Sequence, residues 1–538
     1  MRLMRLLTGL LLLSFVFVPP TVRADVPWQA FEFFKLSGGL NDSFDPTAIE
    51  PAEASDLQNV VFTTGGAIKK RDGFSRLNSS ASPTSSGVTT GGHFYKLSSG
   101  TRYLVRLVND ASGDLIQKMD YGAGTAGPDG TWDDITGATA IAVGNDSQGD
   151  FTQAFDTLII EDGVNTTAPL KWTGSGNAAA LGGSPPEATM VEYHKNHLWS
   201  AGDTDTRSRV VFSNICTTSS TCLETYTATD FFELDTNDGQ VVTGLKSGLD
   251  CLYVWKTSSI WRICGASRDT FTQEQMVRDI GTNSNSSITV INNQFLFKTQ
   301  LGDYAVYDGG INVKIISSKI EGTLTALNLN RIDAVRAVAF DDGTGDQDYY
   351  VCETASGATT HNRVLLYDTF HQAWTKFTGL NCNALWTYEI GTLEQAIAFG
   401  DYSGFVSRYP DTTADAGAAI SAYWQSGQLR IPEIPMRKTF RVSQLYVEQS
   451  GSYNLTFTHR LDFEAAGTST SCSLAGTGAL YDTAVWDSDA YADLTTTICR
   501  VEINEGDYFF QWRVSNNAAS QPWVVKGLRL WVESTQRE

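Results

Sequence analysis

The chain has 538 residues, and its 39 lysines and arginines against 60 aspartates and glutamates give a formal net charge of −21. A content of 41% hydrophobic residues excludes a disordered chain, because burial of that much apolar surface offsets the loss of conformational entropy. The length exceeds what one hydrophobic core usually supports, and the acidic balance without a long basic run excludes general nucleic-acid binding.

Residues 1–24 have the organisation of a secretory signal peptide. Arg2 and Arg5 form a basic end, an apolar run covers 6–18, and Val22-Arg23-Ala24 matches the small-x-small pattern that signal peptidase cleaves. The apolar run is too short to span a bilayer comfortably, and we expect no membrane span after cleavage; an anchor or a misplaced start is the alternative. We therefore expect an exported protein, periplasmic or extracellular, that becomes more acidic when this segment is removed.

Residues 25–78, here called the N-terminal strap, carry turn signals. Pro51 suits the first position of one helical turn, and Gly65-Gly66 suits a hairpin turn. We expect the strap either to fix the path of the chain or to pair its basic strand with an acidic neighbour. The candidate residues are Gly38, Gly39, Asn41, Lys69, Lys70, Arg71 and Gly73.

Short strands dominate residues 79–420. They are rich in aromatic and β-branched residues and are bounded by Gly, Asp, Asn and Ser clusters, while long helical patterns are almost absent. Strand pairs recur at roughly 40–55 residues, the size of a four-stranded propeller blade. We predict an all-β protein with a propeller of six to eight blades; a stacked β-sandwich is the alternative. The pairs lie near 93–119, 151–172, 191–215, 245–264, 290–315, 335–377 and 384–409.

Residues 421–538 form a separate group of mostly alternating strands, at 439–448, 453–459, 499–503, 508–514 and 524–532. Alternation buries one face of each strand, so these residues predict a compact antiparallel β-sandwich domain. The Ala-, Gly- and Asp-rich stretch 411–419 is its expected linker.

All eight cysteines follow the signal, and an even number in an exported chain is typical of disulfides. A two-residue turn at Thr257-Ser258 would place Cys251 opposite Cys264, close enough for a bond; two free thiols are the alternative. The simplest remaining pairs are Cys216–Cys222, Cys352–Cys382 and Cys472–Cys499. No CxxC or Cys/His ligand spacing indicates zinc.

Signals for catalysis are sparse. The six histidines form no HExxH motif, and the chain has no GxSxG elbow and no Walker-type loop. His194 and His197, three apart in a predicted strand, would lie on opposite faces. Asp-rich runs at 203–205, 235–239 and 341–348 lack the distal Glu of an EF-hand and are interpreted as turns. We expect no enzymatic activity, cofactor or metal.

The strap carries a resemblance to a known family. Its Leu36-Ser-Gly-Gly-Leu-Asn41, the stretch 51–60 ending in Asn-Val, and Gly65-Gly-Ala-Ile-Lys-Lys-Arg-Asp-Gly-Phe74 resemble the opening of tailed-phage tail proteins of the nozzle or hub type. The resemblance implies a β-propeller subunit of the virion tail, in a homo-oligomeric ring that surrounds the DNA channel or joins other tail proteins. DNA would pass without sequence-specific binding, as an acidic surface favours.

The signal peptide and the paired cysteines favour a second hypothesis. Tail components ordinarily assemble in the host cytoplasm, where neither feature is expected. A secreted β-propeller that recognises surface glycans or proteins would have both. The 13 tryptophans and 20 tyrosines would then supply sugar-stacking surfaces, although most are expected in the core.

Overall fold

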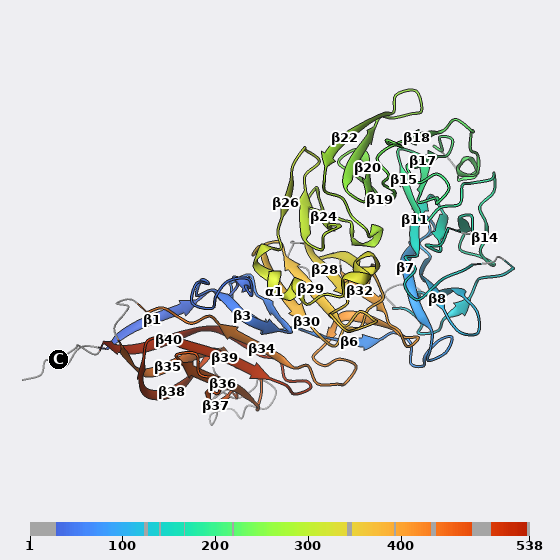
Figure 1. Cartoon of the computed structure of the whole chain (residues 1–538). Helices are drawn as coiled ribbons and strands as arrows, with labels where there is room; N and C mark the ends of the chain where they lie inside the picture. The colour runs from blue at the N-terminus through green and yellow to red at the C-terminus, as the bar shows by residue number, and fades with distance from the viewer. Residues whose placement is uncertain are drawn as a thin grey trace, which may run out of the picture.

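A β-propeller stands beside a β-sandwich in the computed structural model (Figure 1). The predicted all-β fold with these two parts is confirmed. The predicted signal peptide lies outside the described residues. These are residues 28–122, 127–138, 141–165, 167–217, 220–341, 347–391, 394–431, 437–475 and 496–534.

Seven four-stranded antiparallel sheets form the propeller, a number within the predicted six to eight blades. In the first six, the strands pair in chain order. Blades one to three are β7 (Val88–Lys96), β8 (Arg102–Asn109), β9 (Leu115–Asp120) and β10 (Asp133–Asp134); β11 (Asp150–Ala154), β12 (Thr157–Glu161), β13 (Leu170–Trp172) and β14 (Ala179–Ala180); and β15 (Met190–His194), β16 (His197–Ala201), β17 (Arg209–Phe212) and β18 (Phe231–Glu233).

Burial falls from the middle of a blade to its outer edge. Strands β12 and β29 are buried along their whole length, because neighbouring blades cover both of their faces, whereas β10 and β14 are exposed.

Blades four to six are β19 (Val242–Gly248), β20 (Cys251–Lys256), β21 (Ser259–Cys264) and β22 (Thr272–Arg278); β23 (Thr289–Ile291), β24 (Gln294–Lys298), β25 (Tyr304–Tyr307) and β26 (Val313–Ile315); and β27 (Arg336–Asp341), β28 (Gln347–Glu353), β29 (Arg363–Asp368) and β30 (Ala373–Phe377).

Blade seven closes the ring with a strand from the other end of the chain. Its own strands are β31 (Ala384–Glu389), β32 (Gln395–Gly400) and β33 (Val406–Thr412), and β6 (Gly73–Arg76) pairs with β33 as the fourth. Strand β31 then contacts β7 of blade one. A Cβ on Gly73 would lie 2.1 Å from the Ala414 carbonyl oxygen, so this position requires glycine. Residues 73–76 therefore belong to the propeller and not to the strap.

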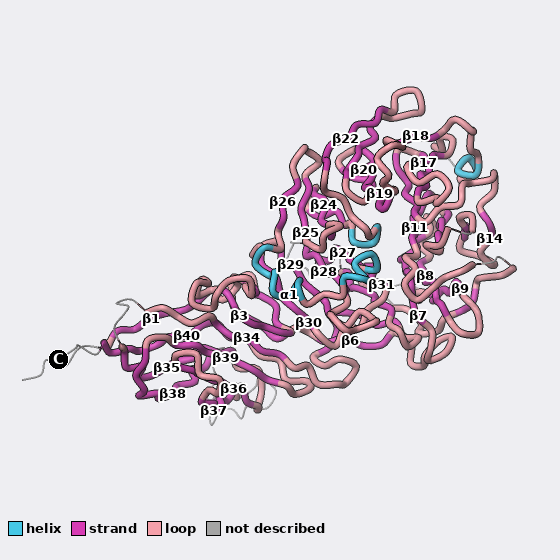
Figure 2. Tube along the Cα trace, in the orientation of Figure 1, coloured by secondary structure: helices cyan, strands magenta, loops and turns pink. Residues whose placement is uncertain are grey.

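Helical segments are short and lie between strands (Figure 2). The expected helical turn at Pro51 is absent: residues 51–52 form a turn, and a strand begins at Glu53. No helix of the described residues is long and apolar enough to cross a membrane. The helical segments are η1 (Thr221–Glu224), η2 (Asn285–Ser287), η3 (Ser318–Ile320), α1 (Glu321–Thr325) and η4 (Leu329–Ala334).

Two six-stranded sheets form the sandwich, and the strap supplies strands to both. One has the order β38-β35-β40-β5-β4, with β1 also paired to β40; the other has the order β2-β3-β34-β39-β36-β37. All pairs are antiparallel except β2 with β3. The strands are β1 (Gln29–Phe34), β2 (Gly39–Leu40), β3 (Glu53–Gln58), β4 (Val60–Phe62), β5 (Ile68–Lys70), β34 (Ala422–Ser426), β35 (Lys438–Glu448), β36 (Asn454–Leu461), β37 (Thr468–Ser473), β38 (Thr496–Asp507), β39 (Phe510–Asn516) and β40 (Val524–Ser534).

One hydrophobic cluster runs through the sandwich and into the propeller. Leu57 and Ile68 of the strap share it with Trp424 of the sandwich and with Tyr304 and Trp374 of blades five and six. The two parts are therefore joined by a common core, and the strap lies inside it. Apolar side chains of the strap, such as Leu57 and Ile68, thus contribute to the core that the two parts share.

The structure contains all four predicted disulfides: Cys216–Cys222, Cys251–Cys264, Cys352–Cys382 and Cys472–Cys499. The predicted hairpin is confirmed, since Lys256 pairs with Ser259 across the turn at Thr257-Ser258. Cys352–Cys382 links blades six and seven, and Cys472–Cys499 links the two sheets of the sandwich. Disulfides persist in oxidising compartments, which fits an exported protein.

Replacing Cys472 and Cys499 together by alanine should lower the free energy of unfolding by about 3–4 kcal/mol, because this disulfide closes a long loop. The loop spans 27 residues, against 6 for Cys216–Cys222. The double alanine variant of that shorter loop should lose only about 2 kcal/mol. Urea unfolding followed by circular dichroism measures both losses. A larger loss from the shorter loop would contradict this ranking.

Candidate functional site

The glycines and the asparagine of the strap fix its path against blade six. Gly39 has a φ of 80°, and a Cβ there would lie 2.8 Å from the Ala373 Cβ. A Cβ on Gly38 would lie 2.8 Å from the Ala52 carbonyl oxygen. Asn41 is buried, and its Nδ2 donates to Glu53 Oε2 at 2.8 Å. These residues therefore determine how closely the strap approaches its neighbours.

The basic residues of the strap find their partners within the chain. Lys69 Nζ lies 2.9 Å from Asp72 Oδ2 at the surface. Lys70 is buried, and its Nζ donates to the Ala518 carbonyl at 2.8 Å; burial lowers the pKa of Lys70 to about 8. The buried Arg71 binds both carboxylate oxygens of Asp415, at 2.8 and 2.6 Å. Lys70 and Arg71 therefore fix the chain path and are not presented to an external acidic neighbour.

His194 and His197 lie on the same face, contrary to the sequence-based expectation. They are cross-strand partners in the β15–β16 hairpin, because residues 195–196 form its turn. Each is buried and hydrogen-bonded separately, His194 Nδ1 to Ser247 Oγ at 2.7 Å and His197 Nδ1 to the Ser213 carbonyl at 2.6 Å. Burial lowers the pKa of both imidazoles, to about 4 for His194. Both are structural, neutral side chains.

Two of the three Asp-rich runs are turns, as predicted; residues 342–346 of the third lie outside the described residues. Asp203 and Asp235 each accept the backbone N–H two residues on, which is how aspartates close turns. Among the described residues, no group of three or more His, Cys, Asp or Glu side chains is arranged to hold a metal ion. Trp28 alone among the described tryptophans is exposed, and the others are buried or half-buried, as expected for most of them.

The axis of the propeller contains a small polar cavity of about 180 Å³. Its wall includes Gly91 and Gly92, where the chain passes close to the rings of Phe151 and Trp386, and Gly149, which lies against Leu107. His93 stacks on Phe151 with 6.0 Å between ring centroids. Asp150 Oδ2 accepts from the Val191 N–H and from Asn285 Nδ2, both at 3.0 Å.

The charges of this axial cavity are arranged around Asp150. Burial raises the pKa of Asp150 to about 6 and lowers the pKa of His93 to about 4. Lys246 lies 3.8 Å from Glu192, whose negative charge raises the pKa of the lysine. A cavity of this size holds water molecules or a small solute.

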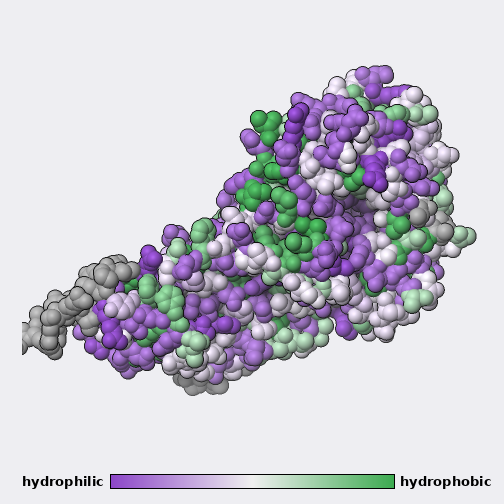
Figure 3. All heavy atoms as spheres, viewed as in Figure 1, coloured by the Kyte–Doolittle hydropathy of each residue, from purple (hydrophilic) through white to green (hydrophobic). Residues whose placement is uncertain are grey.

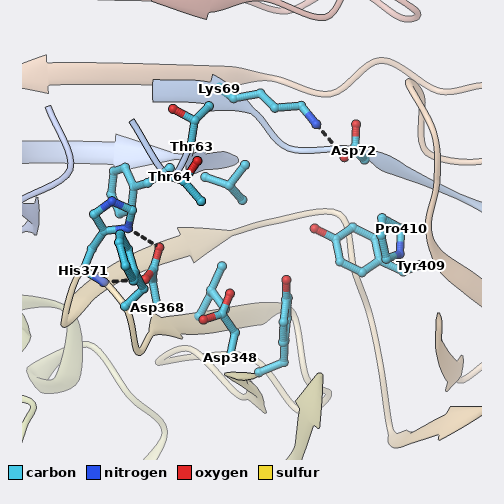
Figure 4. A pocket seen from close by; sticks show the side chains of 14 residues that line it. Thr63, Thr64, Lys69, Asp72, Asp348, Asp368, His371, Tyr409 and Pro410 are labelled. Carbon is cyan, nitrogen blue, oxygen red and sulfur yellow. Dashed lines mark hydrogen bonds and ion pairs between the residues drawn. The ribbon is translucent and has the colours of Figure 1, made fainter. Parts of the chain in front are cut away.

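A larger cavity, of about 280 Å³, lies where the strap meets blades six and seven (Figure 4). We call it the junction pocket. Thr63 and Thr64 reach it from the β4–β5 turn, Asp348 and the Asp368–His371 pair from blade six, and Tyr409 from blade seven. Its lining is completed by Val61, Phe62, Lys69, Asp72, Tyr350, Leu366, Phe370 and Pro410.

The polar groups of the junction pocket are held in place by local hydrogen bonds. Asp368 accepts the His371 backbone N–H at 2.7 Å and its Nδ1 at 2.8 Å. Asp348 Oδ1 accepts the Thr369 N–H at 3.1 Å. Burial raises the pKa of Tyr409, which keeps its hydroxyl neutral. The pocket thus offers oriented hydrogen-bond acceptors beside aromatic rings, a combination suited to binding a ligand.

Arg71→Met should lower the free energy of unfolding by about 3–5 kcal/mol, because it leaves a buried carboxylate without its charged partner. The side chains of Arg71 and Asp415 are 0% and 10% exposed. Lys69→Met, which removes a surface pair, is the control and should cost about 0–1 kcal/mol. Chemical denaturation measures both, and equal losses would contradict the role assigned to the buried pair.

Asp150→Asn should stabilise the protein at neutral pH relative to acidic pH. Burial raises the pKa of Asp150 from 3.8 to about 6 in the folded protein. The free energy of unfolding therefore falls as the pH rises from about 4 to about 6, because the unfolded chain ionises first, and it stays lower above that range. The difference in unfolding free energy between variant and wild type should grow by about 1–2 kcal/mol between pH 4 and pH 7. Denaturation at several pH values tests this, and a pH-independent difference would contradict it.

Comparison with family models and with curated proteins finds no match to this sequence. Solved structures similar to the chain include the WD40 domain of Neurospora crassa Pan2 (9% identity, TM-score 0.37, 64% of this chain and 97% of that one). YCF48 bound to D1 peptide (10%, 0.36, 62% and 94%) and BamB from Moraxella catarrhalis (10%, 0.34, 66% and 95%) are also similar. Because these TM-scores lie below 0.5, the seven sheets of the chain itself define the propeller, and no activity follows from the likenesses.

Proposed function

We propose that the chain is a non-enzymatic structural subunit of a phage tail, in which copies form a ring of the nozzle or hub type. The support is the part that the strap plays in the fold. Gly39 packs on blade six, Arg71 binds Asp415 and Gly73 begins the strand that closes blade seven. The residues that resemble the tail family are thus those that join propeller to sandwich, so the resemblance concerns the architecture.

The proposal assigns DNA to the lumen between copies. The axial cavity of each propeller, at about 180 Å³, is far too small to admit a duplex. A formal charge of −21 on each copy would repel phosphates along such a lumen and keep the genome from binding. The ring, and not the single propeller, is therefore the proposed conduit.

Exposed aliphatic side chains on and beside blade five supply candidate contacts between copies. Leu301, Ile311 and Leu329 are 77%, 74% and 65% exposed, and Ile315 of β26 is also exposed. Figure 3 shows apolar side chains gathered on this side of the propeller. Leu301 lies in the turn before β25 and Ile311 in the turn after it, so the exposed side chains occur at both ends of this strand. Exposed apolar surface is a candidate for contact with another molecule. In the proposed ring, a neighbouring copy covers them.

Negative-stain electron microscopy and mass photometry of the purified mature protein test the proposal. Closed rings are the expected result, and Ile311→Asp should abolish them, because a buried charge without a partner opposes association. Phe463→Asp is the matched control: Phe463 is 59% exposed, lies in the sandwich, and should leave the rings intact. Wild-type protein that remains monomeric under assembly conditions would contradict the proposal, as would rings that tolerate Ile311→Asp.

A second candidate function is a secreted propeller that binds surface glycans or proteins. The junction pocket favours it, because that cavity combines aromatic rings with oriented carboxylates. The two candidates differ in state of association. A monomer with selective ligand binding would favour this second function, and rings would favour the first.

A further inference from the structure

We propose that the junction pocket binds one neutral sugar unit, packed against Phe370 and hydrogen-bonded to Asp348 and Asp368. This inference is independent of ring formation. The pocket lies between two parts of the chain, where ligand sites often occur. Its volume of about 280 Å³ is at the lower end of the range of ligand pockets, which suits a single small ring.

An exposed aromatic side chain forms one side of the pocket. Phe370 is 56% exposed in the turn between β29 and β30, and its ring lies edge-on to that of His371, with 4.8 Å between centroids. Phe62 contacts the same imidazole at 5.7 Å. Exposure of a phenyl ring costs free energy, and an apolar ligand face that covers it recovers part of that cost. A sugar ring offers such a face in its axial C–H groups.

Hydrogen-bond acceptors and donors surround the same space. In Figure 4, Thr63 and Thr64 lie across the pocket from Asp348, while the Asp368–His371 pair and Tyr409 lie on opposite sides. Each carboxylate oxygen accepts more than one hydrogen bond, so Asp368 keeps acceptor capacity beyond its two bonds to His371. Hydrogen bonds from hydroxyls to carboxylates are charge-assisted and strong. The several hydroxyls of a sugar fit this ring of groups.

The charges of the pocket select a neutral ligand. Asp72, Asp348 and Asp368 outnumber the single lysine, Lys69, which is already paired with Asp72 at 2.9 Å. A phosphate or carboxylate ligand would therefore be repelled. Asp368 is already bonded to His371 and Asp72 to Lys69, so two of the three carboxylates have a partner before any cation is added. A neutral polyol with one apolar face satisfies both conditions.

Saturation-transfer NMR on the full mature chain tests the proposal, with methyl glycosides of glucose, galactose and mannose as neutral probes. Glucose 6-phosphate is the anionic probe and agmatine the cationic one. We expect saturation transfer to at least one neutral glycoside and none to the phosphate. Phe370→Ala and Asp348→Asn should each weaken that binding at least tenfold. Asp348→Asn keeps an oxygen to accept the Thr369 N–H, and it replaces the other acceptor oxygen by a donor and removes the charge.

Two matched controls separate the pocket from general surface effects. Phe463→Ala removes another exposed phenyl ring, and Asp308→Asn alters another exposed aspartate that accepts a turn N–H, from Gly310 at 3.0 Å. Both should bind like the wild type, and circular dichroism confirms folding of every variant. Absence of neutral-glycoside binding, binding of agmatine alone, or equal affinity in all four variants would overturn the proposal.

Discussion

The buried ion pair between Arg71 and Asp415 is the contact on which the joining of the two parts depends. Arg71 lies where the chain leaves β5 of the sandwich and enters β6 of blade seven, and Asp415 follows β33. The same guanidinium donates to the Thr378 carbonyl after blade six and to Asn59 Oδ1, both at 2.8 Å. Arginine presents five donors in a rigid fork, and a buried guanidinium must use them. One side chain thus fixes the geometry between strap, blades and sandwich.

A fixed junction explains why the larger cavity forms there. The strap side of the pocket, with Thr63 and Lys69, is positioned by β4 and β5 within the sandwich sheet. The opposite side belongs to blades six and seven, which Cys352–Cys382 links. Because the common core leaves neither side free to move alone, the pocket is preorganised. A ligand would therefore bind without the loss of conformational entropy that ordering the pocket would require. Rigidity at the junction also suits a subunit that must keep one shape within an assembly.

Local patterns predicted more of the fold than of the site. Seven recurrent strand pairs located the blades, because each blade consists of neighbouring strands whose apolar runs and turns are visible in the sequence. The register of Cys251 opposite Cys264 followed from one two-residue turn. The equivalent turn between His194 and His197 was missed, because both histidines were placed in one predicted strand. The junction pocket had no local signal, because segments near 61–72, 348–371 and 409–410 meet only after the ring has closed.

The strap shows why a motif can be recognised before its role is known. Its glycines and basic residues stood out because turns and charge runs are visible locally, yet the carboxylate that pairs with Arg71 and the carbonyl packed against Gly73 lie more than three hundred residues away. A basic run is ordinarily exposed, so pairing with an acidic neighbour was one of the two expectations for it, beside fixing the path of the chain. Burial reverses that logic: once Arg71 is enclosed, its charge requires an internal carboxylate, and Asp415 after the last blade provides it. The basic run of the strap therefore joins the N-terminal residues to the segment after the last blade. Binding of other molecules is left to surfaces to which the strap contributes only part of the lining.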